Sequence, residues 1–235
     1  MRDMGTPADE LRRELTESGV GPGDEVIVPS YGTPDAAEAA LLVGARPVFV
    51  DMDADTFCIS PAAVAAAVTS RTAAVVPVHT FGHPADMPSL LEIGARHGLR
   101  VIGYGGVEEP AGETIRRQAN AAYLDGKLRG VLTPRVALGV EHTYQQYVVR
   151  VPGNGRPDRD AFARALRSRG VACHVPVPTP VHRTQRFWRD LRLPATERAA
   201  DECLALPVDA GMSRRELQRV VSACNALGGL LRSVA

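Results

Sequence analysis

Short apolar runs alternate with alanine- and leucine-rich segments through the first hundred or so residues. The runs are short and rich in β-branched residues, which is typical of buried strands. The segments between them end at a glycine or begin at a capping residue, which is typical of helices. The predicted strands are residues 26–29, 47–51, 73–78 and 100–103, and the predicted helices are residues 34–44, 62–68 and 86–98. This alternation predicts an α/β fold, a parallel sheet with helices on both faces.

The pattern changes after the fourth predicted strand. Residues 105–110, GGVEEP, form a glycine- and charge-rich break, and residues 113–128 predict one long, rather polar helix. The remaining predicted elements are strands at 144–151 and 171–175 and helices at 158–169, 196–204 and 214–227. We therefore expect two domains. Residues 1–108 would be a truncated large domain of parallel α/β type, and residues 113–235 a long helix plus a small C-terminal α+β domain.

Composition narrows the function classes. The formal net charge is zero, so the chain has no general attraction to nucleic acid or to an anionic membrane. Residues 1–10 lack the apolar core of a secretory signal, and no run is long enough to span a membrane. We therefore expect a cytoplasmic protein. The four cysteines match no zinc-binding spacing, which favours buried free thiols; they are Cys58, Cys173, Cys203 and Cys224.

The histidines offer limited candidate chemistry. His79 and His83 are four residues apart but follow a predicted strand in a loop with glycine and proline, so we expect no metal site. His142, His174 and His182 are candidate acid–base groups, because an imidazole can exchange protons near neutral pH. For each of them, the alternative is a packing or capping role.

Several segments carry specific motifs in a fixed order. Residues 19–30 read GVGPGDEVIVPS, residues 44–51 read GARPVFVD, and residues 77–87 read PVHTFGHPADM. Supporting matches follow at residues 141–147, 168–171, 176–182 and 205–208. Together these segments resemble the DegT/StrS-type sugar aminotransferases, enzymes that use pyridoxal phosphate (PLP) and have the fold type I architecture. The resemblance implies a partial fold type I structure, with a parallel half-sheet and a small C-terminal α+β domain.

The first departure from the family concerns its lysine. PLP enzymes of this kind bind the cofactor covalently through a lysine amine, which also moves protons. The family carries that lysine in a block between the fourth strand and the small-domain helix, and here residues 103–113 run almost directly from one to the other. Lys127 is the only lysine in the sequence, and it falls in the last turn of the predicted helix, where a solvated cation is favoured. The resemblance therefore implies that the catalytic segment is missing.

The second departure concerns the acid beside the cofactor's pyridine nitrogen. The family places an aspartate just after the fourth strand, and Tyr104 stands in its place here. A phenol is neutral at pH 7 and cannot supply the charged partner. Glu108 and Glu109 follow shortly after a glycine pair and are the alternative carboxylates.

Two further positions depart at the cofactor ring and its phosphate. Thr33 stands where the family has an aromatic residue that would stack on the ring. Gly5 and Thr6 resemble the end of the family's Ser-Gly-Thr phosphate cradle at a helix start, but proline follows and the offset differs by about two residues. Candidate cofactor-binding residues are thus Gly5, Thr6, Thr33 and Tyr104, and Tyr104 is also a candidate catalytic residue.

These departures predict a degenerate family member without PLP-dependent transamination and without a cofactor of its own. We expect it to act as a partner or auxiliary protein in sugar, antibiotic or other natural-product biosynthesis. Two alternatives stay open. The chain could be an aminotransferase that is active only with a second chain, or a PLP-independent enzyme that reuses the pocket.

The resemblance also predicts how the chain associates. The four retained strands are neighbours in the family's sheet, so we expect a contiguous half-sheet with residues 101–102 at its edge. An apolar edge carries unpaired N–H and C=O groups and invites pairing. We therefore expect a homodimer, or a heterodimer with a family member, with a nucleotide sugar or another small molecule as the compatible ligand.

Overall fold

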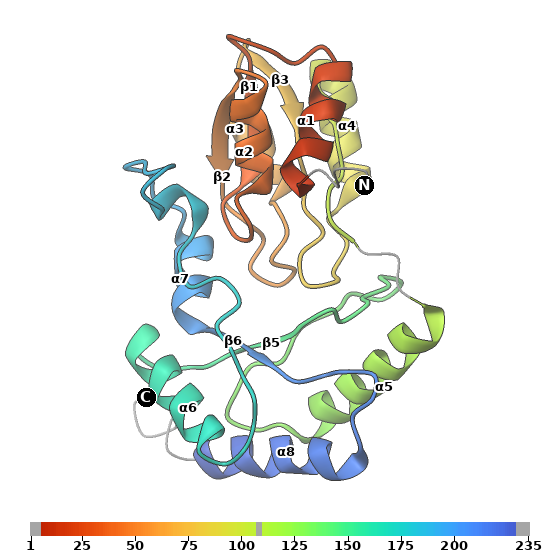
Figure 1. Ribbon diagram of the computed structural model, residues 1–235, viewed down its shortest axis with the longest axis vertical. Coiled ribbons are helices and arrows are strands. Elements are labelled where there is room, and N and C mark those ends of the chain that lie inside the picture. The colour runs from red at the N-terminus through yellow and green to blue at the C-terminus, as the bar shows by residue number, and fades with distance from the viewer. Residues whose placement is uncertain (1–5, 107–109, 229–235) are drawn as a thin grey trace, which may run out of the picture. The chain divides into compact units, whose positions relative to one another are not determined.

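A computed structural model describes residues 6–106 and 110–228, and the chain forms two compact units (Figure 1). Their boundaries are interleaved along the sequence. The first unit comprises the described residues of Met1–Thr80 with Pro84–Gly106 and Thr179–Thr196, and the second comprises Phe81–His83 with the described residues of Val107–Pro178 and Glu197–Ala235. The sequence places one boundary at residues 108–113, whereas the structure groups Thr179–Thr196 with the first unit.

The first unit is built on a four-stranded parallel sheet. Its strands are β1 (Glu25–Pro29), β2 (Arg46–Val50), β3 (Thr72–Val75) and β4 (Arg100–Val101), in the order β2-β1-β3-β4. A further parallel bridge joins Val78 to Tyr104 beyond the ends of β3 and β4. The predicted contiguous half-sheet is confirmed, and its outer strand is β4, which ends at Val101 rather than at residue 102.

Helices cover both faces of this sheet. One core cluster joins α1 (Pro7–Glu17) and α2 (Asp35–Leu42) to one face, and a second cluster joins α3 (Pro61–Ala67) and α4 (Met87–His97) to the other. The capping signals are as expected. The Ser60 side chain accepts from Ala63 N at the start of α3, Asp86 accepts from Ser89 N at the start of α4, and Gly98 ends α4 with φ of 70°.

The sequence did not predict α1. Its residues, PADELRRELTE, are mostly charged, and the helix buries Leu11 and Leu15 fully, one turn apart. Together with the buried Ala8, these leucines form one apolar face at helical spacing, and this face packs against α2.

Residues 179–196 return to the first unit through the short 3₁₀ helix η1 (Val181–Arg183). Val181, Phe187 and Leu193 pack into the cluster that includes α1 and α2. The Asp51 carboxylate accepts from the backbone N–H groups of Ala195 and Thr196, at 2.9 and 2.8 Å. This return segment is therefore packed into the core of the first unit and hydrogen-bonded to it.

The second unit packs helices against a two-stranded antiparallel sheet of β5 (Tyr147–Arg150) and β6 (Cys203–Leu206) (Figure 1). Its hydrophobic cluster draws on α5 (Ala111–Lys127), α6 (Arg156–Arg167) and α8 (Arg214–Gly228) together with both strands. The helix α7 (Pro194–Glu202) leads directly into β6.

Three predictions for this unit are right only in part. The predicted helix 196–204 ends at Glu202, because the next four residues, CLAL, form the fully buried strand β6. Short apolar runs are ambiguous between helix and strand, which explains the error. The predicted strand 171–175 is reduced to a single bridge between His174 and Ala205, and the carbonyl of Cys173 accepts from the Arg167 guanidinium. The predicted strand 144–151 shortens to β5.

Candidate functional site

The fold brings two of the predicted cofactor-binding residues together on one carboxylate. The Thr33 hydroxyl donates to Asp35 Oδ2 at 2.7 Å, and the Tyr104 hydroxyl donates to the same oxygen at 3.3 Å. Asp35 is the first residue of α2, and Tyr104 follows β4. Sequence reasoning missed Asp35, although an acidic residue directly after Pro34 is a helix-start signal.

Tyr104 is a neutral hydrogen-bond donor in this setting. Burial raises the pKa of its phenol to about 12, and the charge of Asp35, its hydrogen bond and the charge of Glu10 act in the same direction. The surroundings of Tyr104 are therefore negative, and its hydroxyl stays protonated at neutral pH.

The N-terminus of α1 is closed by a carboxylate of its own chain. The backbone N–H of Thr6 donates to Asp9 Oδ2 at 2.9 Å, and the Thr6 hydroxyl donates to the same oxygen at 2.8 Å. These bonds lower the pKa of Asp9 below its ordinary value, the side-chain bond most. A phosphate at this helix start would compete with the Asp9 charge. Gly5, Glu108 and Glu109 lie outside the described residues.

His182 lies in the core of the first unit. Its side chain is fully buried, with Nδ1 2.6 Å from Ser30 Oγ, and its backbone N–H donates to the same Oγ at 3.0 Å. Because Ser30 Oγ accepts from this N–H, its own proton can point to Nδ1, which places the ring proton on Nε2. The geometry favours a positioning role at the end of β1 over contact with a substrate.

His142 belongs to an aromatic stack in the second unit. Its ring stacks on Tyr144 at 4.1 Å and meets His83 edge-on at 5.4 Å, and its Nδ1 accepts from the Tyr144 N–H at 2.9 Å. Burial, followed by the charge of His83, lowers the pKa of His142 to about 4. The imidazole is therefore uncharged at neutral pH. Next along the stack, Tyr147 donates to Asp125 Oδ1 at 2.5 Å.

His174 is exposed at a pocket of about 280 Å³ in the second unit. The residues that line the pocket are Gln145, Gln146, Ala172, Cys173, His174, Ala205, Leu206, Pro207, Val208 and Asp209. Among the described residues, Nε2 of Gln145 and Oε1 of Gln146 are buried without a hydrogen-bond partner. The three candidate histidines therefore have different surroundings: His182 the core of the first unit, His142 the aromatic stack, and His174 the edge of this pocket.

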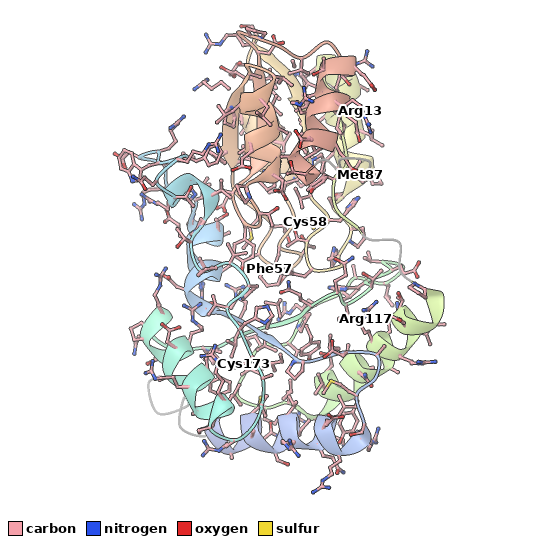
Figure 2. The ribbon with its side chains drawn as sticks, in the orientation of Figure 1. Arg13, Phe57, Cys58, Met87, Arg117 and Cys173 are labelled. Atoms are coloured by element: carbon pink, nitrogen blue, oxygen red, sulfur yellow. The ribbon has the colours of Figure 1, made fainter. Side chains whose placement is uncertain are left out.

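Lys127 and the four cysteines are the other residues that the sequence singles out. Lys127 is the exposed last residue of α5, and its carbonyl accepts from Asn225 Nδ2 at 2.9 Å. All four cysteines are free thiols; Cys58 lies in the first unit and Cys173 in the second (Figure 2). Over residues 6–106 and 110–228, no cluster of histidine, cysteine and acidic side chains could hold a metal ion. None of the described helices combines the length and apolar content that crossing a membrane requires.

Comparison with known proteins identifies relatives along nearly the whole chain. The family described as DegT/DnrJ/EryC1/StrS aminotransferases matches residues 5–103 and 111–225. The erythromycin biosynthesis sensory transduction protein EryC1 of Saccharopolyspora erythraea is 30% identical over 310 residues, covering 95% of this chain and 84% of the relative. The UDP-N-acetyl-3-dehydro-alpha-D-glucosamine 3-aminotransferase of Acidithiobacillus ferrooxidans is 27% identical over 301 residues, covering 91% and 80%.

Solved structures show the same fold. DesV of S. venezuelae, determined with a ketimine intermediate, superposes with a TM-score of 0.85 at 25% identity, covering 95% of this chain and 83% of that one. The family is PLP-dependent, and structures of this fold include PLP and PMP forms. The alignments with the relatives above are longer than the 235 residues of this chain, so they include stretches of the relatives that have no counterpart here.

Proposed function

Because this chain belongs to the DegT/DnrJ/EryC1/StrS aminotransferase family, we propose that it is a member without PLP-dependent transamination, which acts as a partner or auxiliary protein in sugar or natural-product biosynthesis. The observation that carries the proposal is the placement of its only lysine. Lys127 is an exposed residue at the end of α5, with the setting of a solvated helix-terminal cation.

Tyr104, in the first unit, also supports the proposal, because it stands where the resemblance places the family's aspartate. A PLP ring needs an acid beside its pyridine nitrogen if it is to act as an electron sink. Tyr104 offers a neutral phenol instead, with its pKa raised to about 12. The neighbouring Asp35 carboxylate already accepts from both Tyr104 and Thr33. These residues do not fit the charge requirements of the cofactor ring.

The residues that would hold the phosphate group of the cofactor do not fit it either. Asp9 occupies the N-terminal groups of Thr6 that would otherwise attract an anion. The family match is interrupted between residues 103 and 111, which is where the resemblance places the lysine-bearing block.

Borohydride trapping tests the loss of cofactor chemistry. The protein and its Lys127→Arg variant, which keeps the charge and removes the amine, are incubated with one equivalent of PLP and reduced with borohydride. The intact mass of each is then measured by mass spectrometry. A full-length family aminotransferase serves as the positive control. We expect a saturating adduct on the control only. A stoichiometric adduct on the wild-type protein that disappears in Lys127→Arg would overturn the proposal.

The auxiliary role is tested by co-expression with a full-length family aminotransferase encoded beside this chain. We expect a mixed complex on gel filtration in which the cofactor content equals that of the full-length partner alone. Cofactor in excess of the partner's own sites, together with transamination that neither chain shows alone, would replace the auxiliary role with an enzyme completed by two chains.

A further inference from the structure

The return segment of the first unit presents a tryptophan to solvent. Trp188 is the only tryptophan of the chain, and it is 58% exposed. Single exposed leucines are common on protein surfaces, but tryptophan is highly buried on average. Tryptophan is also enriched among the few residues that supply most of the binding energy of protein interfaces. Its exposure here therefore indicates a contact with another molecule.

The residues on either side of Trp188 hold its backbone in place. Phe187 is 2% exposed, and its ring meets the ring of Phe49 edge-on at 5.9 Å. The backbone N–H of Arg189 donates to the carbonyl of His182 at 2.9 Å. The indole is thus presented from a backbone that is already ordered, so binding through it costs less conformational entropy than binding through a flexible loop.

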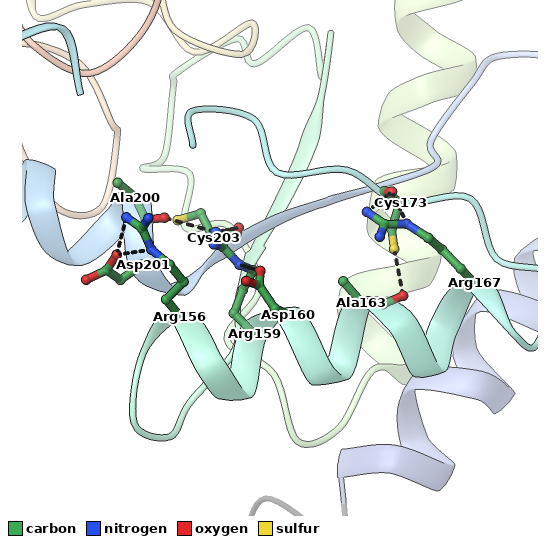
Figure 3. Close-up of polar contacts among 9 residues, drawn as sticks. All are labelled: Arg156, Arg159, Asp160, Ala163, Arg167, Cys173, Ala200, Asp201 and Cys203. Carbon is green, nitrogen blue, oxygen red and sulfur yellow. Dashed lines mark hydrogen bonds and ion pairs between the residues drawn. The ribbon is translucent and has the colours of Figure 1, made fainter. Parts of the chain in front are cut away.

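The arginines that follow Trp188 carry uncompensated charge. Elsewhere in the chain arginines have acidic partners, as Arg156 does in Asp201, whose Oδ1 lies 2.8 Å from Nη2 (Figure 3). Arg189 and Arg192 are exposed, and within the described part of the chain neither has a carboxylate at ion-pair distance. Asp190 is the only acidic residue between them, so the surface beside the indole is positively charged.

This positive charge is local. The described residues of the first unit include 14 acidic and 10 basic side chains, and four of those ten lie in residues 183–192. A long polyanion such as nucleic acid would therefore meet like charge over the rest of the unit, whereas the carboxylates of a protein surface can be confined to this segment. A second copy docked through the same surface would oppose arginine to arginine, which is also unfavourable.

We propose that Trp188, Arg189 and Arg192, named the Trp188 surface, form the docking site for a partner protein with an apolar recess bordered by carboxylates. The recess would take the indole, and the carboxylates would pair with the two guanidinium groups, which favour planar, bidentate contacts. The inference rests on the proposed auxiliary role and names the surface through which this chain would bind the full-length aminotransferase.

Fluorine NMR of the mixed complex tests whether Trp188 is at the interface. Growth with 5-fluorotryptophan labels this chain at one position, because it has one tryptophan, and the full-length partner is left unlabelled. We expect the single resonance to shift or broaden when the partner is added. Collisional quenching by an added paramagnetic probe should also decrease, because the indole becomes covered.

Substitutions measure what the Trp188 surface contributes to affinity. Trp188→Ser should weaken the mixed complex by about tenfold or more in calorimetry, as expected for an interface hot spot. Leu91→Ser is the matched control, because Leu91 is a 53% exposed residue of α4 in the same unit. Both side chains are exposed, so both variants should keep the wild-type melting temperature within a few degrees, and weaker binding cannot be attributed to unfolding.

The charged part of the surface is tested separately. Replacing Arg189 and Arg192 together by glutamine should weaken binding and reduce its dependence on salt concentration, because two charge pairs are lost. Arg13→Gln, at an exposed arginine of α1, should leave both quantities unchanged. Equal salt dependence in the wild type and the double variant would contradict the carboxylate border.

The outcomes separate this inference from the auxiliary role. A wild-type mixed complex whose affinity is the same in Trp188→Ser, or is weakened equally by Leu91→Ser, would overturn the docking surface and leave the auxiliary role standing. A resonance that shifts when the chain alone is concentrated would assign the surface to a second copy and overturn the partner assignment. Failure of the wild-type chain to form any mixed complex would overturn both.

Discussion

Ser30 Oγ lies 2.6 Å from Nδ1 of His182, and both side chains are fully buried although 152 positions separate them in sequence. The pair fastens the end of β1 to the start of η1, and the backbone N–H of Val181 adds a bond to the Ser30 carbonyl at 2.9 Å. It therefore secures the return segment on which Phe187 and Leu193 are carried into the first core.

Ser30→Ala should lower the free energy of unfolding of the first unit by about 1–3 kcal/mol, because the variant leaves Nδ1 of His182 buried without its partner. Urea denaturation followed by circular dichroism measures the change. Ser70→Ala, at an exposed serine of the same unit, should stay within about 0.5 kcal/mol of wild type. Equal effects of the two substitutions would mean that the Ser30–His182 bond contributes nothing.

His142 should make stability depend on pH between about 6.5 and 4. Its folded pKa is lowered to about 4 from 6.5, so the unfolded chain binds more protons in this window and stability rises with pH. On acidification the protein should lose on the order of 3 kcal/mol from this group by about pH 4. His79, whose pKa is also lowered by burial, acts in the same direction.

His142→Phe checks the assignment, because a phenyl ring can keep the stack on Tyr144 and cannot titrate. The urea midpoint of this variant should change less between pH 7, 5.5 and 4.5 than the midpoint of the wild type does. His97→Gln, at an exposed histidine, should keep the full wild-type slope. A slope unchanged in His142→Phe would assign the acid sensitivity to other groups.

Substitutions at Tyr104 test the charge around the position where the family has an aspartate. Tyr104→Phe removes one 3.3 Å hydrogen bond and should cost less than about 1 kcal/mol. Tyr104→Asp restores the family's residue but adds a third negative charge near Asp35 and Glu10, so it should destabilise the protein clearly more than Tyr104→Phe. Thermal melts at pH 7.5 measure both, and added PLP should not rescue Tyr104→Asp. Rescue by PLP would mean that one substitution rebuilds the cofactor site.

The outer strand β4 gives a prediction about association. The Ile102 N–H donates to the Val75 carbonyl at 3.0 Å, so strand alternation directs the Val101 N–H away from β3. If a second chain pairs there, the Val101 amide should exchange slowly in a sedimenting dimer and faster on dilution, while the Ile102 amide stays protected throughout. A protein that sediments as a monomer with a protected Val101 amide would contradict pairing at this edge.

The sequence anticipated the parts of the fold that depend on local signals. Buried strands and glycine- or serine-bounded helices around β1 to β4 followed from composition and spacing. The helix α1 was missed because two leucines carry its packing, and β6 was missed because CLAL reads equally well as the end of α7. For β6 tertiary burial decides, whereas the buried positions of α1, Ala8, Leu11 and Leu15, do follow a helical spacing among charged residues.

The same distinction applies to the sites. Tyr104 and Thr33 could be selected by their positions in the motifs, but their common partner Asp35 lies 69 positions from Tyr104 and required the fold. Gln145 and Gln146 look like ordinary polar residues beside a strand. Their burial without partners is a property of the packed second unit, so no pattern in the chain could have indicated the pocket.

The chain leaves the first unit after Gly106 and comes back to it at Thr179. A gene cut short after residue 106 would therefore encode β1 to β4 without η1, Phe187 and Leu193, and the core beside α1 and α2 would open to water. Loss of an internal segment leaves this return path intact, whereas loss of the downstream half would not. The first unit is therefore complete only when the chain has passed through the second unit and returned as far as Leu193.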